Sequence, residues 1–348
     1  MPLRTTAAVL VRHGGPEALE IRTDWVVPDP GPGEVLVEVR AAGVNNTDLW
    51  TRQGAYGTAA DPDAEAGWLG PLAFPRVQGG DVGGVVVAVG QDGGDLLGRR
   101  VLVDPAAYRD DGPQASPVAY LGSESDGGFA GYVLVAADHA HDVSDSPLSD
   151  DELACLPVAY GTATRMLRRA GLQQGETVLV TGASGGVGIA LVQLAAAHGA
   201  HVVAVTSSDK ADAVQGAGAR QTVLRDAGDV AGQVRRAAPR GLHVVADVVG
   251  GPGLAALLPL LVDDGRWVIA GAIAGPVVEL DLRRLYLHSL RMIGSSMHTS
   301  EDFAALVELA RTGAVRPLVA DTYPLTRIHE AQERFAAAHH VGKLVLHP

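Results

Sequence analysis

A glycine-rich run, Thr181-Gly-Ala-Ser-Gly-Gly-Val-Gly188, follows the apolar stretch Val178–Val180 and precedes a helix-like stretch, Ile189–Ala197. Glycines between a strand and a helix let the backbone approach a pyrophosphate, and the free N–H groups at the helix start bind its charge. This context, more than the glycine count, is typical of a dinucleotide site. The alternative is a tight turn that binds nothing. The expected cofactor-binding residues of the turn are Ser184, Gly185, Gly186, Val187 and Gly188.

The residues after the next strand indicate which dinucleotide would bind. A site for NAD usually has Asp or Glu about 20 residues beyond the glycines, at the end of that strand. Ser207 stands there instead, followed by Ser208 and by Lys210, one of only two lysines in the chain. Hydroxyls and a cation suit a 2′-phosphate, so we expect NADP(H), with Arg225 as a second cation. Asp209 is the residue that favours NAD(H) instead.

Two kinds of segment must position these residues. In the first 150 residues, Val-rich runs are separated by Gly/Pro clusters, which is typical of an antiparallel barrel or sandwich. The strand candidates there are Ala7–Arg12, Glu34–Arg40, Gly84–Val89 and Arg99–Val103. From Thr177 onward, short apolar strands alternate with helices, which predicts an α/β fold with a parallel, doubly wound sheet. The candidates are strands Val178–Thr181, His201–Thr206, Thr222–Leu224, His243–Val248 and Arg266–Ala270, helices Val187–Ala197 and Leu254–Leu261, and a last strand, Lys343–Leu346.

Two long loops interrupt the first segment. Residues 57–72 are acidic and rich in Gly and Ala, and residues 105–128 are polar with no convincing strand. Loops of this length usually cover a binding site or are disordered.

Length and charge exclude several classes of protein. A chain of 348 residues is long enough for two domains, and a net charge of −13 is unlike the basic face of a nucleic-acid-binding protein. The single Cys155 excludes an internal disulfide and suggests a reducing compartment, the cytoplasm. Residues 177–208 carry no charge, but glycines divide them, so we expect a strand, a turn, a helix and a strand rather than a membrane span.

Four motifs in one order resemble a known family. They are Gly43-Val-Asn-Asn-Thr-Asp48, Phe74-Pro-Arg-Val-Gln-Gly-Gly-Asp-Val-Gly-Gly84, Ala183-Ser-Gly-Gly-Val-Gly188 and Gly342-Lys-Leu-Val-Leu346. Together they resemble the medium-chain dehydrogenase/reductase superfamily, on its zinc-independent, quinone oxidoreductase (zeta-crystallin-like) side. The resemblance implies a GroES-like β-barrel catalytic domain (1–150), a Rossmann cofactor domain (151–298) and a C-terminal return to the first domain (299–348).

The resemblance also predicts that no metal takes part. In the zinc-dependent relatives a Cys, a His and a third ligand hold the catalytic zinc, and the matching positions here are Asn45, Gly80 and Val158. None of these replaces a thiolate or an imidazole ligand. Cys155 lies close to the third position in sequence, but we expect it to be a small buried hydrophobic residue.

Without a metal, hydrogen-bond donors must stabilise the negative charge that develops on the substrate. The resemblance implies that Tyr56 donates a hydrogen bond or a proton, that Asn45 donates from its amide, that Thr162 lies near the nicotinamide and that Asp48 orients its neighbours. The remaining cofactor-binding residues carried over from the family are Ala270, Gly271, Ala272 and Lys343.

The function expected from this resemblance is NADPH-dependent reduction of a quinone, an enone or a related activated C=C or C=O compound. Two alternatives stay open: a metal-free alcohol or carbonyl dehydrogenase, and a structural or regulatory protein that binds NADPH with little turnover. Asn46 replaces the family's usual Pro, and the 57–72 loop after Tyr56 is longer than usual and could set substrate choice. The apolar segment 265–280 is expected at the edge of the Rossmann sheet, where it would pair two copies into a homodimer.

Overall fold

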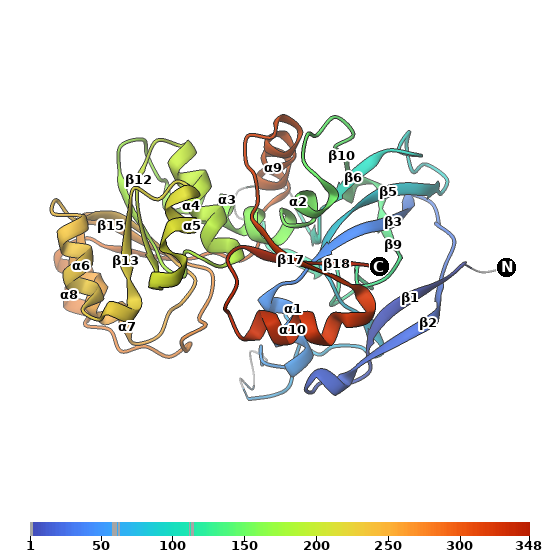
Figure 1. Cartoon of the computed structure of the whole chain (residues 1–348), viewed down its shortest axis with the longest axis horizontal. Helices are drawn as coiled ribbons and strands as arrows, with labels where there is room; N and C mark the ends of the chain where they lie inside the picture. Colours follow the sequence, from blue (N-terminus) through green and yellow to red (C-terminus); the bar gives the residue numbers. More distant parts are fainter. Residues whose placement is uncertain (1–2, 58–60, 62, 111, 113–114) are drawn as a thin grey trace. The chain divides into compact units, whose positions relative to one another are not determined.

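The structure is a computed structural model that describes residues 3–57, 61, 63–110, 112 and 115–348. The chain divides into two compact units, and the first comprises Met1–Val158 and Thr299–Pro348 (Figure 1). The second unit is the continuous segment Ala159–His298. The corresponding boundaries in the sequence analysis lie after residues 150 and 298, so residues 151–158 belong to the first unit in the structure.

The first unit contains two main β-sheets and a short hairpin. A three-stranded sheet has the order β2-β1-β4; a seven-stranded sheet has the order β10-β6-β5-β3-β18-β17, and β9 also pairs with β3. The strands are β1 (Leu3–Leu10), β2 (Leu19–Val27), β3 (Glu34–Gly43), β4 (Arg76–Val77), β5 (Asp81–Val89), β6 (Arg100–Val103), β7 (Ala106–Tyr108), β8 (Pro117–Tyr120), β9 (Tyr132–Ala136), β10 (Ala140–Asp142), β17 (Val319–Pro324) and β18 (Lys343–His347). Apolar side chains from both sheets form one core, as expected where strands alternate inward and outward residues.

The end of the chain returns to the first unit. Strand β18 lies between β3 and β17, with Val345 opposite Gly43 and Leu346 opposite Ala42 (Figure 1). The helices of this unit are α1 (Asn46–Gln53), α2 (Asp150–Ala154), α9 (Ser300–Thr312) and α10 (Ile328–Ala336), and α3 (Pro157–Ala170) crosses into the second unit. The return places Lys343 next to the residues that precede α1.

The second unit is a six-stranded parallel sheet with the order β13-β12-β11-β14-β15-β16. The strands are β11 (Thr177–Val180), β12 (His201–Thr206), β13 (Gln221–Leu224), β14 (Leu242–Asp247), β15 (Leu261–Ile269) and β16 (Arg291–Gly294). The helices are α4 (Gly186–Ala197), α5 (Ala211–Gly216), α6 (Val230–Ala237), α7 (Gly253–Leu257) and α8 (Leu282–Leu287). The order reverses at β11 and β14, which is the arrangement of a doubly wound dinucleotide-binding sheet. The predicted fold class is confirmed.

Two details of the sequence analysis are wrong. Residues 105–128 contain the antiparallel hairpin of β7 and β8, with Ala106 opposite Tyr120. The strands are too short and too mixed with polar residues to form an apolar run. Residues 265–280 are not an edge strand, because β16 pairs with β15 on its outer side and the strand ends at Ile269. Arg291 at the start of β16 conceals that strand in the sequence.

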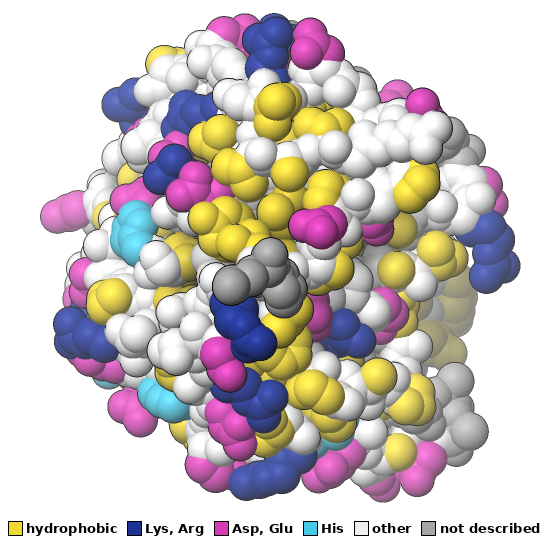
Figure 2. All heavy atoms as spheres, turned by 90° about the vertical axis from the view of Figure 1, so that its right-hand side faces the viewer, with side chains coloured by type: hydrophobic (Ala, Val, Ile, Leu, Met, Phe, Trp, Pro, Cys, Tyr) yellow, Lys and Arg dark blue, Asp and Glu magenta, His cyan; other side chains and the backbone are white. Residues whose placement is uncertain are grey.

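The uncharged stretch 177–208 folds as the sequence predicts. No helix among the described residues is long and apolar enough to cross a membrane. The uncharged stretch 177–208 forms β11, the glycine turn, α4 and β12. On the face drawn in Figure 2, basic and acidic side chains are interspersed.

Candidate active site

Three buried polar side chains of the first unit form one hydrogen-bonded network. Lys343, the first residue of β18, donates from Nζ to Asp81 Oδ2 at 2.7 Å and to Asn45 Oδ1. The same Nζ donates to the Val44 carbonyl at 2.8 Å. The side chains of Lys343 and Asp81 are 3% and 0% exposed. A buried ammonium and a buried carboxylate therefore compensate each other, with additional hydrogen bonds around the pair.

This network determines how the Asn45 amide is oriented. Its Nδ2 donates to Asp81 Oδ2 at 2.8 Å and has a longer contact of 3.4 Å with the Gly43 carbonyl. Its Oδ1 accepts from Lys343. The sequence analysis assigned this N–H to a substrate oxygen, whereas in the structure it serves Asp81. The Asn45 amide therefore has hydrogen-bond partners within the first unit, just before α1.

Asp48 stabilises the first turn of α1 and is itself a titratable group. Its Oδ2 accepts from the Asn45 backbone N–H at 2.7 Å, which satisfies one of the free donors at a helix start. Gln78 Nε2 donates to the Asp48 carbonyl at 2.9 Å. Burial raises the pKa of the Asp48 carboxyl to about 7, although the Asn45 N–H and the Lys343 charge oppose the shift. Asp48 can thus change charge near neutral pH.

Tyr56 lies just beyond α1 and contacts the same helix. Gly54, with a φ of 69°, ends α1 in the left-handed region and turns the chain toward Tyr56. The Tyr56 hydroxyl donates to Thr47 Oγ1 at 2.9 Å, and its ring meets Trp50 edge-on with 5.5 Å between centroids. Burial raises the pKa of Tyr56 to about 12, so it remains a protonated donor at neutral pH. The sequence analysis did not identify Thr47.

Tyr120, the last residue of β8, has no sequence signal of its own. Its hydroxyl lies against Gly80, one of the three positions compared with the zinc ligands. A β-carbon added to Gly80 would lie 2.0 Å from the Tyr120 hydroxyl oxygen, so only glycine fits there. The Trp68 ring packs edge-on against Tyr120 with 5.3 Å between centroids. Trp68 belongs to the 57–72 loop, and residues 58–60 and 62 of that loop lie outside the described part of the structure.

These residues do not fit a catalytic zinc. Asn45 is bound to Lys343 and Asp81, the space beside Gly80 holds a tyrosine hydroxyl, and Val158 contributes its backbone N–H to Asp81 Oδ1 at 2.7 Å. Across the described residues, no three His, Cys, Asp or Glu side chains gather closely enough to hold a metal ion. Zinc in proteins needs thiolate, imidazole or carboxylate ligands in a tetrahedral set, and these residues do not supply one.

Cys155 is a packing residue. It lies in a small buried cluster with Ala41, Ala154 and Val345, as the sequence analysis expected. Burial raises the pKa of its thiol well above the usual range. A thiol that stays protonated is neither a nucleophile nor a metal ligand.

The second unit carries the glycine turn. It joins β11 to α4, and Gly182 adopts a φ of +57°, which favours glycine. A β-carbon on Gly188 would lie 2.1 Å from the Gly182 carbonyl oxygen, so Gly188 allows α4 to begin against the turn. Gly185 is the N-cap of α4, and a β-carbon there would approach only the Gly182 carbonyl, at 3.6 Å. The backbone here is open enough for a phosphate at the helix N-terminus, so the turn fits a dinucleotide.

Asp247, the last residue of β14, stabilises this edge and was missed in the sequence analysis. Its Oδ1 accepts from Thr181 Oγ1 at 2.6 Å and from the Val249 N–H at 2.8 Å. Its Oδ2 accepts from Trp267 Nε1 at 3.1 Å. One buried carboxylate therefore connects the ends of β11 and β14, where the strand order reverses.

The predicted cofactor residues 270–272 and the predicted catalytic residue Thr162 lie elsewhere in the second unit. Residues 270–272 follow β15, where the Ala270 N–H donates to the Asp247 carbonyl at 3.0 Å. A β-carbon on Gly271 would lie 2.8 Å from the Val248 carbonyl oxygen, so this segment adjoins β14. Thr162 is a buried residue of α3, 7% exposed.

The residues predicted to bind the 2′-phosphate lie in two neighbouring turns, and one of them, Ser208, is hydrogen-bonded to Asp226. The Ser208 hydroxyl donates to Asp226 at 2.6 Å, and its backbone N–H donates to the same carboxylate at 3.1 Å. These hydrogen bonds hold the pKa of Asp226 below its usual value. Arg225 precedes Asp226 in the same turn, Ser207 precedes Ser208, and Lys210 is 9% exposed. Asp226 was not considered in the sequence analysis.

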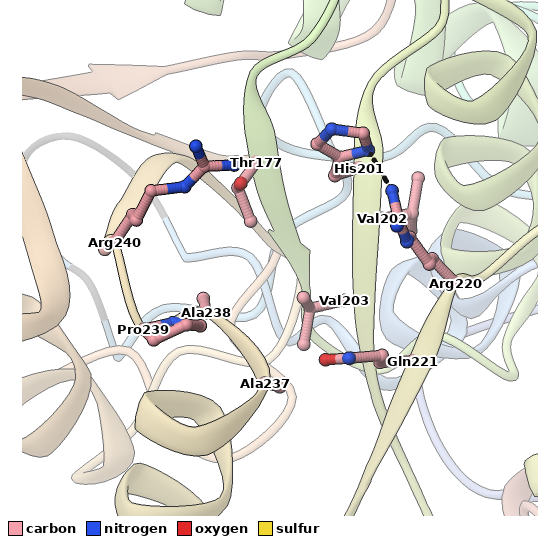
Figure 3. Close-up of a pocket in the computed structure, with 11 residues that line it drawn as sticks. Thr177, His201, Val202, Val203, Arg220, Gln221, Ala237, Ala238, Pro239 and Arg240 are labelled. Atoms are coloured by element: carbon pink, nitrogen blue, oxygen red, sulfur yellow. Dashed lines mark hydrogen bonds between the residues drawn. The ribbon is translucent and has the colours of Figure 1, made fainter.

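One cavity of the second unit lies away from the glycine turn. It measures about 180 Å³, and Thr177, His201 and Gln221 on its wall are the first residues of β11, β12 and β13 (Figure 3). Arg220 donates to His201 Nδ1 at 2.9 Å on one wall of the cavity. The glycine turn follows the opposite ends of these strands, so this cavity is separate from the candidate cofactor site.

Comparison with known proteins agrees with the fold. Residues 31–145 match the model of the alcohol dehydrogenase GroES-like domain, and residues 186–312 match that of the zinc-binding dehydrogenases. The chain is 33% identical to the acryloyl-coenzyme A reductase of Metallosphaera sedula, over 97% of this chain and 99% of that protein. It is 30% identical to the quinone oxidoreductase of Mus musculus, over 96% of this chain and 95% of that protein.

A solved structure is similar over the full length. It is that of a candidate alcohol dehydrogenase from Sinorhizobium meliloti, which has 48% sequence identity and a TM-score of 0.96, covering 100% of this chain and 98% of that one. The matches therefore extend over both units. The chain belongs to the medium-chain dehydrogenase/reductase superfamily, a family of pyridine-nucleotide-dependent oxidoreductases.

Proposed function

We propose that this protein is a metal-free, NADPH-dependent reductase of quinones, enones or related activated C=C or C=O compounds. The observation that carries the proposal is Tyr56, a protonated donor hydrogen-bonded to Thr47 beside a set of residues that cannot bind zinc. The names of two relatives, a quinone oxidoreductase and an acryloyl-coenzyme A reductase, point to conjugated acceptors of this kind.

The first unit would stabilise charge on the substrate. A bound nicotinamide dinucleotide would supply a hydride to an electron-poor carbon of the substrate. The electron pair displaced from the double bond moves onto the conjugated oxygen, and Tyr56 turns to it the hydrogen bond that it donates to Thr47 Oγ1 in the structure. The Thr47 hydroxyl then donates its own proton to the Tyr56 oxygen. Thr47 holds the Tyr56 hydroxyl, and Asp48 and Asn45 hold the start of α1. A proton from solvent completes the reduction.

We propose NADP(H) as the cofactor, bound by the glycine turn and by residues 270–272. Ser207, Lys210 and Arg225 would recognise the 2′-phosphate by hydrogen bonds and charge. Ser208 belongs to the same group, but the phosphate must compete with Asp226 for its two donors. Lys343, which the sequence analysis grouped with the cofactor residues, has its hydrogen bonds within the first unit and is proposed as a positioning residue.

We also propose a homodimer formed through the second unit, in a reducing compartment such as the cytoplasm. Five large apolar side chains after β15 are exposed: Ile273, Val277, Leu282, Tyr286 and Leu287. An apolar group of this size on one segment is typical of an interface. The buried, unpaired Cys155 suits a reducing environment.

The test is a substrate panel of quinones, enones, aldehydes and alcohols with NADPH or NADP⁺, followed at the nicotinamide absorbance. We expect oxidation of NADPH with quinones or enones, at rates that a chelator does not change. Reduction of NADP⁺ by alcohols alone would support a dehydrogenase, and tight NADPH binding with no turnover would support a binding protein. Loss of activity after chelation, restored by zinc, would overturn the metal-free mechanism.

A further inference from the structure

Tyr120 has a buried donor without an acceptor. Its side chain is 3% exposed, and among the described residues its hydroxyl has no hydrogen-bond partner. Buried hydroxyl groups are nearly always paired, because an unpaired one has lost its contact with water without replacement. Tyr56, in the same unit, illustrates the usual case with its bond to Thr47. An unpaired buried hydroxyl is explained if a ligand supplies the missing acceptor.

Close backbone packing holds this hydroxyl in place. The segment after β8 lies directly on residues 78–80, since a β-carbon on Gly122 would be 2.6 Å from the Gly79 N atom. A β-carbon on Gly79 would be 2.5 Å from the Phe129 ring. The Tyr120 backbone N–H donates to Glu124 Oε2 at 3.0 Å, which fixes the end of the strand. These contacts fix the backbone from which the Tyr120 ring extends.

The charges around Tyr120 decide what it can bind. Burial raises the pKa of Tyr120 well above its usual value, and Asp48, Asp81, Tyr56 and Glu124 raise it further. The phenol thus remains protonated and acts as a donor. The neighbouring carboxylates would repel an anionic ligand such as a free carboxylate. A neutral carbonyl oxygen, which gains negative charge only during the reaction, suits this environment.

We propose that the Tyr120 hydroxyl binds the oxygen of a neutral, conjugated carbonyl substrate and donates a hydrogen bond to the negative charge that develops there. The inference rests on the proposed function and names the substrate class and the group that contacts the substrate. The phenol keeps its proton, and no bond to Tyr120 forms. Gly80, at a position where zinc-dependent relatives have a ligand, leaves the space for this hydroxyl.

The test compares Tyr120→Phe with Tyr160→Phe, a matched change at another buried tyrosine. Tyr160 donates to Gln193 Oε1 at 2.8 Å, so its loss should lower Tm by about 2–4 °C. Tyr120→Phe should leave Tm unchanged or raise it, because no bond within the protein is lost. It should lower kcat with enones or quinones by roughly 100-fold. The Kd for NADPH, measured without substrate, should stay the same.

A binding measurement separates this inference from the proposed function. Tetramethylbenzoquinone quenches tryptophan fluorescence, and Trp68 packs against Tyr120. The Kd of this quinone for the protein without cofactor should be about tenfold higher in Tyr120→Phe than in the wild type. A tenfold rise without turnover of any substrate by the wild type would keep the inference and remove the reductase function. The inference would be overturned if Tyr120→Phe kept the turnover and the quinone affinity of the wild type. It would also be overturned if Tyr120→Phe lost as much Tm as Tyr160→Phe, or if the wild type bound no quinone.

Discussion

The buried pair of Lys343 and Asp81 gives the sharpest test of the first unit. The two side chains are 3% and 0% exposed. Asp81 also accepts hydrogen bonds from the Asn45 amide and from the Val158 backbone N–H. Lys343→Met leaves a buried carboxylate without its counter-charge. Breaking a buried pair in this way costs about 3–5 kcal/mol of unfolding free energy. We expect Lys343→Met to lose an amount in this range.

The double variant is more informative than either single change. Asp81→Asn with Lys343→Met removes both charges, so the double variant should be more stable than the sum of the single losses predicts, by about 2 kcal/mol or more. Arg283→Ala is the control, since its ion pair with Asp281 is exposed (74% and 48%) and its loss should leave the unfolding free energy nearly unchanged.

Urea unfolding followed by tryptophan fluorescence and circular dichroism measures these free energies. Trp25, Trp50 and Trp68 lie in the first unit and only Trp267 lies in the second, so fluorescence reports mainly the unit that carries the pair. The reasoning is refuted if Lys343→Met loses less than about 1 kcal/mol, or if the losses of the single variants add in the double variant.

Four further outcomes are expected. Burial raises the pKa of Asp48 from 3.8 to about 7, so the folded state keeps a proton that the unfolded chain has released, and the free energy of unfolding falls as pH rises. Between about pH 5 and 7 the wild type should lose about 1.4 kcal/mol of unfolding free energy per pH unit more than Asp48→Asn. Parallel curves of unfolding free energy against pH would contradict the shift. Lys210→Ala should raise the Kd for NADPH at least about tenfold more than that for NADH, and equal changes would remove its role at the 2′-phosphate. Gly188→Ala should weaken NADPH binding by about tenfold or more, because its β-carbon would lie 2.1 Å from a carbonyl of the same turn, whereas Gly216→Ala, with open space around its β-carbon, should bind normally. Tyr56→Phe should lower kcat by roughly 10–100-fold at unchanged Kd for NADPH, and wild-type turnover would exclude it from the reaction.

The second unit was largely predictable because its order is local. Strand β12 has the predicted bounds, His201–Thr206, and the glycine turn stands between β11 and α4 as expected. Buried parallel strands are continuous apolar runs, and each is followed by a helix, so neighbouring residues contain most of the signal. The edge strand β16 was missed because a strand that begins with Arg291 has no such run.

The candidate site of the first unit was only partly predictable, because its contacts join distant parts of the chain. Lys343 and Asp81 are separated by 262 residues, and no spacing rule connects them. One signal was present: Lys343 is one of only two lysines and begins the last strand. Tyr120 was hidden more completely, since its place depends on the missing β-carbon of Gly80 and on a hairpin that has no apolar pattern.

The protonation states in the first unit are consistent with the proposed reduction of a conjugated carbonyl. Alcohol oxidation requires a group that removes the hydroxyl proton, and zinc enzymes lower the pKa of the bound oxygen to make this possible. Burial raises the pKa of Tyr56 to about 12 and raises that of Tyr120 well above its usual value, so neither phenol is a base at neutral pH. Reduction requires donors, and both phenols are donors. An alcohol dehydrogenase would need a base instead, and the titratable candidate in this unit is Asp48, with a pKa of about 7 and with Oδ2 accepting from the Asn45 N–H.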